Sequence, residues 1–279
     1  MAAGFIVVDV FAREALAGNA LAVFPDPGSV DPGRMQRVAR EMNLSETTFV
    51  TAASVDSYAV RIFTPADELP FAGHPTLGTA WTLRRLGAIS GDRVTQRSAA
   101  GDTPVRFESD RVWLERGGDG GEDLDDIDRT LGAFQIDDTY VGFDGAEIAD
   151  RSVALRPAIA DAGVPLLMLP LASPASVAAL KAPSSLGDVD GVYCFAPLGP
   201  GRLKARFFAP GIGVSEDPAT GAAAAALGLY LGARAGSLEV EIEQGVEIAR
   251  PSFISLRAAP GRAEVGGQVH QASEGSLVA

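Results

Sequence analysis

A chain of 279 residues with 47% hydrophobic and 21% charged residues is long enough for two domains with buried cores, which excludes a disordered protein. No run of about 18 apolar residues is present and no basic leader precedes the first apolar stretch, so we expect a cytoplasmic protein without a membrane partner. The formal net charge of −13 argues against a nucleic-acid partner, and a single cysteine excludes a disulfide framework.

The first half of the chain alternates predicted strands and helices. β-branched and aromatic residues, broken by turn residues, indicate the strands. Apolar residues at helical spacing, with Asp31 and Pro32 as cap and first helical residue, indicate the first helix, which ends near Asn43. The expected strands cover residues 5–12, 19–26, 46–53, 57–65, 103–109 and 111–117, and the expected helices residues 32–43 and 75–89.

The second half again mixes the two kinds of element, and it closes on residues 238–269, whose alternating pattern predicts a meander. Between the halves, the Gly- and Asp-rich residues 118–127 are predicted to be a linker. We therefore expect an N-terminal domain over residues 1–117 and a C-terminal domain over residues 128–279. The expected strands here cover residues 153–157, 165–171, 191–197 and 204–210, and the expected helices residues 174–182 and 221–235.

Two similar segments indicate an internal repeat. Arg61–Pro65 (RIFTP) and Arg206–Pro210 (RFFAP) share the order arginine, two apolar residues, a small residue and proline. Chance could produce such a pair, but each segment is followed by a polar loop and a helix rich in small residues, which favours one unit used twice. The unpaired N–H groups and positive dipole end of each helix start suit a substrate carboxylate.

Glu46 is a candidate acid–base residue. It stands in NLSETTFV, between a predicted helix and a predicted strand, among the apolar Leu44, Phe49 and Val50. Apolar surroundings disfavour the charged carboxylate and would raise the pKa of Glu46 toward the range that suits proton transfer. The residues alone also allow a solvated glutamate at a strand start, or one that caps a backbone amide.

His74 and Asp217 stand beside the two helix starts. The positive end of the helix would lower the pKa of His74 and keep its ring neutral, although a turn histidine bonded to its own backbone is the alternative. Asp217 precedes the second helix, where an N-cap role also explains it and Glu216 competes for either role. Thr220 and Gly221 would offer a hydroxyl and an open backbone to an anion.

A metal or nucleotide site is not expected. His270 is the other histidine, and no pair of histidines has the spacing of a zinc site. Neither a Walker sequence nor a GxGxxG sequence stands before a helix. Cys194 lies in a strand-like segment and is interpreted as a buried structural thiol.

The chain resembles the PhzF-type phenazine-biosynthesis family, relatives of diaminopimelate epimerase, and the combination of SET, ELPFAGHPTLGTA and EDPATG is highly specific for it. The resemblance implies an α+β fold of the diaminopimelate-epimerase-like class: two pseudo-symmetric domains, each a sheet wrapped around a central helix, with strand exchange near the C-terminus. It further implies a homodimer without metal, nucleotide or pyridoxal cofactor. The matching segments are GNALAVF, MNLSETTFV, RIFTPADELPFAGHPTLGTAW, AGVPLLMLPL, RFFAPGIGVSEDPATGAAAAALGLYL and EQGVEIARPSFISL.

The resemblance also assigns roles to residues of this chain. The family's acid–base glutamate corresponds to Glu46, and its assisting histidine and aspartate correspond to His74 and Asp217. Three departures stand out: Ala222 where the family often has serine, and Ala20 and Ala249 in place of proline and glycine. The residues expected to bind the substrate are Gly73, Thr76, Thr220, Gly221 and Ala222.

The sequence therefore predicts a cofactor-independent isomerase. It would transfer a proton on a small carboxylate-bearing substrate, cyclic if the phenazine resemblance extends that far, in the cleft between the domains. A two-thiol racemase is excluded, because Cys194 lies in neither helix-start loop. Two alternatives stay open: a metabolite-binding dimer without turnover, and an epimerase with one glutamate and a second, non-thiol base.

Overall fold

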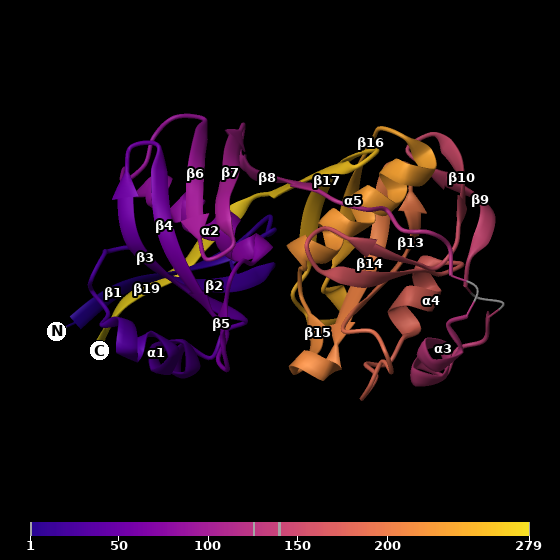
Figure 1. Cartoon of the computed structure of the whole chain (residues 1–279), viewed down its shortest axis with the longest axis horizontal. Helices are drawn as coiled ribbons and strands as arrows, with labels where there is room; N and C mark the ends of the chain where they lie inside the picture. The colour runs from indigo at the N-terminus through magenta and orange to yellow at the C-terminus, as the bar shows by residue number, and fades with distance from the viewer. Residues whose placement is uncertain (1, 125, 139–140, 279) are drawn as a thin grey trace. The chain divides into compact units, whose positions relative to one another are not determined.

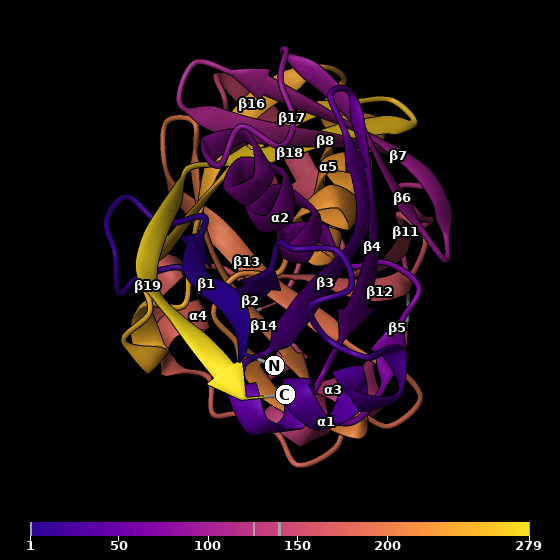
Figure 2. The ribbon, with the colours of Figure 1, turned by 90° about the vertical axis from the view of Figure 1, so that its left-hand side faces the viewer.

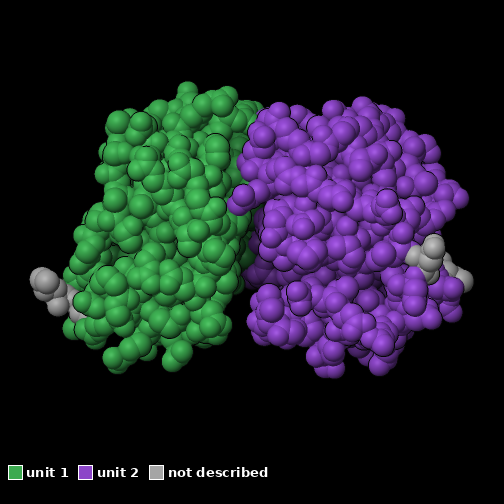
Figure 3. Space-filling model, in the orientation of Figure 1, with its two compact units in different colours: residues 1–114, 266–279 green, residues 115–265 purple. Residues whose placement is uncertain are grey.

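The computed structural model describes residues 2–124, 126–138 and 141–278 (Figure 1). The chain divides into two compact units, coloured separately in Figure 3. Unit 1 comprises residues 1–114 and 266–279, and unit 2 comprises residues 115–265. The fold is mixed α and β, as the sequence predicts.

Unit 1 surrounds helix α2 with strands, as Figure 2 shows. Buried side chains of β1, β2 and α2, such as Val8, Leu21 and Leu77, form the interface between the helix and the strands. The elements are β1 (Ala2–Val10), β2 (Asn19–Phe24), η1 (Pro32–Arg34), α1 (Met35–Met42), β3 (Glu46–Ser54), β4 (Ser57–Phe63), β5 (Glu68–Leu69), α2 (Gly73–Arg85), β6 (Arg93–Ser98), β7 (Gly101–Glu108), β8 (Arg111–Gly117) and β19 (Val269–Val278).

Unit 2 has the same plan around helix α5, which lies beside β16 and β17 in Figure 1 and also packs on β11 and β12. Residues 223–232 of α5 are all buried, so the alanine-rich sequence provides a helix that is covered on every side. The elements are α3 (Asp128–Phe134), β9 (Phe143–Ile148), β10 (Arg151–Leu155), β11 (Ala158–Asp161), β12 (Pro165–Pro170), α4 (Pro174–Ala179), β13 (Val192–Gly199), β14 (Arg202–Ala209), η3 (Pro210–Ile212), β15 (Val214–Asp217), α5 (Gly221–Ala235), β16 (Leu238–Gln244), η4 (Val246–Ile248), β17 (Ser252–Ala259) and β18 (Arg262–Gly267).

The strand registers confirm the internal repeat. Arg61 on β4 faces Phe49 on β3, and Arg206 on β14 faces Cys194 on β13 in the same antiparallel arrangement. In each unit this hairpin continues into parallel pairs on both sides, β2 with β3 and β4 with β6, and β12 with β13 and β14 with β16. Counting along these pairs gives the equivalent residues: Asn19 and Val164, Glu46 and Gly191, Glu68 and Glu216, Leu69 and Asp217, Gly73 and Gly221, His74 and Ala222.

The predicted helices form close to their expected positions. The Asp31 side chain accepts a hydrogen bond from Gly33 N at 2.8 Å, and the short η1 helix leads into α1, which ends at Asn43 in the left-handed conformation. Helix α2 begins at Gly73, two residues before the predicted start at Pro75. Pro75 fits inside the first turn because the N–H groups of that turn have no partner within the helix.

The predicted linker is packed within unit 2. Asp119 pairs with Asp161, Asp123 pairs with Ala158, and Arg234 on α5 donates to the Gly120 carbonyl at 3.1 Å. A Cβ atom on Gly118, Gly120 or Gly121 would collide with backbone atoms of residues 159, 161 or 229. The glycines here permit close approach of the backbone to β11 and α5, which composition alone does not distinguish from a flexible linker.

The C-terminal strand corrects the predicted end of the C-terminal domain. Residues 266–279 belong to unit 1, although the predicted C-terminal domain over residues 128–279 includes them. The reason is β19, which pairs antiparallel with β1 from Val10↔Val269 to Ala2↔Val278. This return of the chain occurs at the end for which strand exchange was expected.

Among the described residues, no helix combines the length and the apolar composition that crossing a membrane requires. The longest apolar helix, α5, is enclosed by strands of its own unit.

Substitution of alanine at two helical glycines is expected to change the free energy of unfolding in opposite directions. A Cβ on Gly232 in α5 would meet the backbone of Ala259 on β17, whereas a Cβ on Gly132 in α3 meets nothing within 4 Å. We expect Gly232→Ala to lower the free energy of unfolding by about 1–3 kcal/mol through overpacking. Gly132→Ala should raise it by about 0.5–1 kcal/mol through helix propensity. Denaturant unfolding of both variants measures this, and a stabilised Gly232→Ala variant would contradict the packing described here.

Candidate active site

Glu46 is the first residue of β3 and lies beside β2, where its Cα pairs with Leu21. Helix α1 ends four residues earlier and the chain reverses through Asn43, so the glutamate emerges where helix and strand meet, as predicted. Its side chain is 16% exposed. Glu46 is therefore neither a solvated surface residue nor fully enclosed.

His74 is the nearest ionisable partner of Glu46. Its Nε2 atom lies 3.1 Å from Glu46 Oε2, but the two groups lack the alignment of a full hydrogen bond. Catalytic hydrogen bonds are often loose without ligand. The structure thus brings together two of the three predicted catalytic residues.

The ring of His74 is neutral because it is buried. The residue is 5% exposed, and loss of water around the ring lowers the pKa of His74 to about 3. The sequence predicts a lowered pKa from the positive end of α2, and the structure confirms the direction but assigns it to burial. A neutral imidazole carries one N–H donor and one acceptor nitrogen.

Asn19 determines which nitrogen carries the hydrogen. The Nδ2 amide of Asn19, a donor, lies 3.4 Å from His74 Nδ1, so Nδ1 is the acceptor. The ring hydrogen then sits on Nε2, which faces Glu46. Asn19, His74 and Glu46 form a line along which a neutral histidine can donate to a carboxylate and orient it.

The start of α2 is built around Thr76. Its hydroxyl donates to the Ala72 carbonyl at 2.8 Å and accepts from Gln96 Nε2 at 2.8 Å, and Tyr58 OH lies 3.0 Å from Gln96 Oε1. Thr76 is fully buried. Its side chain therefore holds the helix start in place, whereas the sequence predicts it to bind substrate. No side chain caps α2, so the first amides, at Gly73 and His74, are the groups that suit an anion.

Unit 2 holds Asp217 in a network at the start of α5. Thr220 Oγ1 donates to Asp217 Oδ2 at 2.6 Å, and Gln244 Nε2 donates to Thr220 Oγ1 at 3.1 Å and to the Asp217 carbonyl at 2.9 Å. Tyr193 OH donates to Gln244 Oε1 at 2.8 Å. Burial raises the pKa of Tyr193, and the charge of Asp217 raises it further. The network fixes Asp217 in its half-buried position.

Asp217 and Glu216 differ in their partners. The N-cap residue of α5 is Thr220, which makes no side-chain capping bond. Glu216 is paired with Arg206 and is not available for the role of Asp217. Because the Thr220 hydroxyl is bonded to Asp217, Thr220 supports that carboxylate, while Gly221 and Ala222 contribute the uncapped amides.

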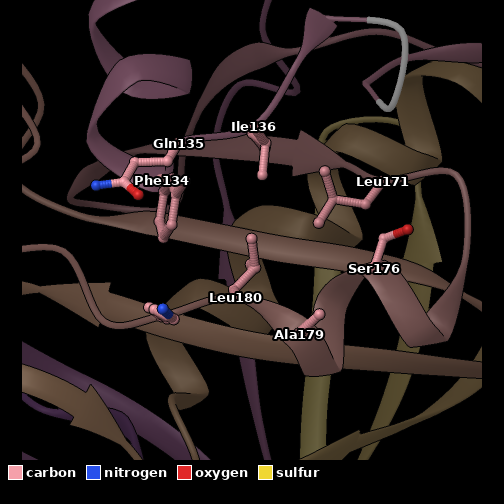
Figure 4. A pocket seen from close by; sticks show the side chains of 8 residues that line it. Phe134, Gln135, Ile136, Leu171, Ser176, Ala179 and Leu180 are labelled. Carbon is pink, nitrogen blue, oxygen red and sulfur yellow. The ribbon is translucent and has the colours of Figure 1, made fainter.

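A cavity of about 340 Å³ in unit 2 lies apart from these residues (Figure 4). It is bordered by the end of α3, the end of β12 and helix α4, it is partly open, and none of the predicted site residues lines it. Its walls are mainly apolar. The lining residues are Phe134, Gln135, Ile136, Leu171, Ser176, Ala179, Leu180 and Lys181.

The other residues with metal-binding or nucleophilic side chains were candidates for a further site. Within residues 2–124, 126–138 and 141–278, no cluster of three or more His, Cys, Asp or Glu side chains could hold a metal ion. Cys194 is fully buried, and burial raises the pKa of its thiol, which fits the predicted structural role.

Sequence reasoning missed the polar residues that hold the site together. Asn19, Gln96 and Gln244 are all fully buried and hydrogen-bonded to site residues or their neighbours. One signal was present: each is an amide in a segment of otherwise strand-like pattern. Buried amides are retained where they have partners, so such a residue at the end of a strand marks a built polar network.

Solved structures define the class of the fold. The chain matches a phenazine biosynthesis protein of the PhzF family from Bacillus anthracis with a TM-score of 0.84, 19% identity and full coverage of both chains. It also matches a hydroxyproline epimerase from Agrobacterium vitis, with a TM-score of 0.59 and 12% identity over 98% of this chain and 92% of that one. The predicted diaminopimelate-epimerase-like fold is confirmed.

The sequence comparisons give the family. The family model described as phenazine biosynthesis-like protein matches residues 8–275, and the chain belongs to this family. It is 39% identical to the trans-2,3-dihydro-3-hydroxyanthranilate isomerase of Pseudomonas fluorescens, over 93% of this chain and 91% of that protein. The predicted small-molecule isomerase is thereby confirmed at the level of its class.

The buried histidine predicts a pH dependence of stability. The pKa of His74 is about 3 when folded and near 6.5 when unfolded, so the unfolded chain binds more protons between these values. The contribution of His74 is fully present above pH 6.5 and is lost as the pH falls toward 3, with a limiting slope of about 1.4 kcal/mol per pH unit. Denaturant unfolding of wild type and of His74→Gln at several pH values measures it, because the difference between them isolates this residue. A pH-independent difference would show that His74 is not buried neutral.

Proposed function

We propose that the chain moves a proton between two carbons of a small cyclic carboxylate, with Glu46 as the acid–base group. The observation that carries the proposal is the 3.1 Å contact of Glu46 Oε2 with the buried, neutral His74. The substrate class follows from the relative that is 39% identical, whose name gives trans-2,3-dihydro-3-hydroxyanthranilate as its substrate.

The proton transfer can be derived from this contact. As a carboxylate, Glu46 removes a proton from a carbon that is acidified by a neighbouring unsaturated system, and as a carboxylic acid it returns the proton to a second carbon. Donation from His74 Nε2 favours the ionised form before abstraction and orients the carboxylate. Because His74 is neutral, it does not hold the carboxylate in a strong ion pair, which would make Glu46 a weaker base.

Binding of the substrate is assigned to the helix starts. The amides of Gly73 and His74 in unit 1, and of Gly221 and Ala222 in unit 2, are uncapped by side chains and suit a carboxylate. Asp217, held by Thr220, would accept a hydrogen bond from an amino or hydroxyl group of the substrate.

The internal repeat favours the isomerase over the epimerase alternative. Inversion at one carbon by two bases requires an acid–base group on each face of the substrate. The positions equivalent to Asn19, Glu46 and His74 are occupied in unit 2 by Val164, Gly191 and Ala222, which carry no titratable group. Asp217 stands where unit 1 has Leu69, so the halves offer different groups at different places. A single mobile proton on Glu46 is the simpler account.

The predicted homodimer is also a proposal, supported by the family resemblance, and the cytoplasmic location stays an expectation from the sequence. A metabolite-binding dimer without turnover would have the same fold and the same helix starts. The isomerase and the binding dimer differ in their need for Glu46, because a binding protein needs no acid–base group at this position.

Substitution of Glu46 tests the proposed function directly. Glu46→Gln keeps the size of the side chain but removes the proton acceptor, so kcat with trans-2,3-dihydro-3-hydroxyanthranilate should fall by about 10²- to 10⁴-fold. Binding of the aromatic analogue 3-hydroxyanthranilate, measured by calorimetry, should change little. Glu41→Gln on the exposed face of α1 is the matched control and should behave as wild type.

Two outcomes would overturn the proposal. Turnover by Glu46→Gln at a rate close to that of wild type would remove Glu46 from the chemistry. Tight binding of the carboxylate by wild type, with neither turnover nor uptake of deuterium from heavy water, would favour the binding protein.

A further inference from the structure

A buried ion pair includes Glu216, the residue before Asp217. Arg206 on β14 donates from Nε to Glu216 Oε1 at 2.8 Å and from Nη2 to Oε2 at 2.6 Å, a two-pronged contact. Glu216 immediately precedes Asp217 in β15. The two side chains are 6% and 7% exposed, so each charge depends on the other for its stabilisation. Displacement of one partner would leave the other charge buried and unpaired.

The third nitrogen of Arg206 reaches a different element. Nη1 donates to the Leu180 carbonyl at 2.6 Å and lies within 3.3 Å of the carbonyls of Val177 and Ala178, where α4 ends. The last carbonyls of a helix lack partners within the helix, and a cation satisfies them. Arg206 therefore joins β15 to the end of α4, the same segment that borders the cavity in Figure 4.

The backbone pairing of β15 is short and irregular. This strand has four residues, and its pairing with β14 shifts register between Phe207↔Asp217 and Ala209↔Val214. A short strand with a register irregularity does not by itself fix the direction of a side chain at its end. The Glu216 side chain, held at both carboxylate oxygens by Arg206, supplies a further anchor one residue from Asp217, in addition to the bonds that Thr220 and Gln244 make with Asp217.

The repeat provides a comparison within the same molecule. Arg61 and Glu68 in unit 1 are the equivalents of Arg206 and Glu216, and they make the same two-pronged contact at 2.7 and 2.6 Å. Their side chains are 35% and 38% exposed, and the residue after Glu68 is Leu69, which carries no charge. The copy of the pair that is buried is the one that adjoins a candidate catalytic carboxylate.

We propose that Arg206 is a positioning residue of the active site, which acts through Glu216 to hold the Asp217 carboxylate in place. Arg206 is not assigned a contact with substrate. This inference rests on the proposed function, because it assumes that Asp217 contacts the substrate. Loss of the pair should displace Asp217 and reduce kcat/KM by about 10- to 100-fold, the usual result of a misplacement near 1 Å.

The double variant Arg206→Met/Glu216→Met separates positioning from stability. Replacing both charges by apolar side chains leaves no unpaired charge, so the variant should fold. Arg61→Met/Glu68→Met removes the equivalent exposed pair and is the matched control. Thermal unfolding, kcat/KM on trans-2,3-dihydro-3-hydroxyanthranilate, and the ¹³C carboxyl signal of Asp217, assigned with Asp217→Asn, are measured for both.

We expect the buried-pair variant to unfold cooperatively, to lose activity by about 10- to 100-fold and to show a shifted Asp217 signal. The exposed-pair variant should match wild type in all three measurements. A folded buried-pair variant with wild-type activity and an unchanged Asp217 signal would overturn the proposal. If the double variant does not fold, Glu216→Gln, which keeps the shape of the side chain, is measured in the same way and decides by the same criteria.

The ¹³C carboxyl signal of Asp217 also distinguishes a failure of the proposed function from a failure of the positioning role of Arg206. If wild type does not turn over this substrate, the proposed function fails in its substrate, yet the Asp217 signal still reports whether Arg206 positions that residue. If wild type is active and the buried-pair variant is equally active with a shifted signal, Asp217 does not matter for turnover and the inference fails alone.

Discussion

The proposed chemistry depends on one contact, between the carboxylate of Glu46 and the neutral ring of His74 at 3.1 Å. Burial makes this contact possible, because a histidine in water would be partly protonated and would hold the carboxylate as an ion pair. Asn19 then directs the ring hydrogen toward Glu46. The histidine is placed by α2, the glutamate by the start of β3 and the asparagine by the start of β2, so the folding of unit 1 around α2 assembles the three groups.

The two units use one arrangement of strands and helix for different chemistry. Both begin a buried central helix at a glycine, without a side-chain cap, four residues after a short strand. Unit 1 adds the Asn19–His74–Glu46 line, and unit 2 has apolar or small residues at those positions but adds Asp217 where unit 1 has leucine. Each helix start is supported by a tyrosine, a glutamine and a threonine, yet these residues are not equivalent: Tyr58 lies on β4, whereas Tyr193 lies on β13. Both helix starts have such polar side chains because an uncapped helix start requires polar groups nearby to keep it rigid.

Much of this could be predicted from the sequence, for physical reasons. The repeat was visible in RIFTP and RFFAP because the arginine of each copy makes the same contact with a glutamate, and Glu46 and His74 were identifiable by their places at element ends and by family resemblance. The buried amides were not predicted, because their role lies in partners distant in sequence: Asn19 and His74 are 55 residues apart. The packed residues 118–124 were misjudged because glycine serves both flexibility and close packing. The hydroxyls of Thr76 and Thr220 have partners within the protein, which a sequence does not show, and substrate binding by these residues stays a prediction.

The most direct test of the central claim is ¹⁵N NMR of the histidine rings, followed from pH 5 to pH 8 in wild type and in Glu46→Gln. The account predicts that one ring, assigned to His74 by substitution, stays neutral with its hydrogen on Nε2 over this whole range, and that its Nε2 signal moves when Glu46 is replaced. A His74 ring that is protonated at neutral pH, or whose hydrogen sits on Nδ1, would contradict the account, because the histidine could not then orient Glu46 as a neutral donor.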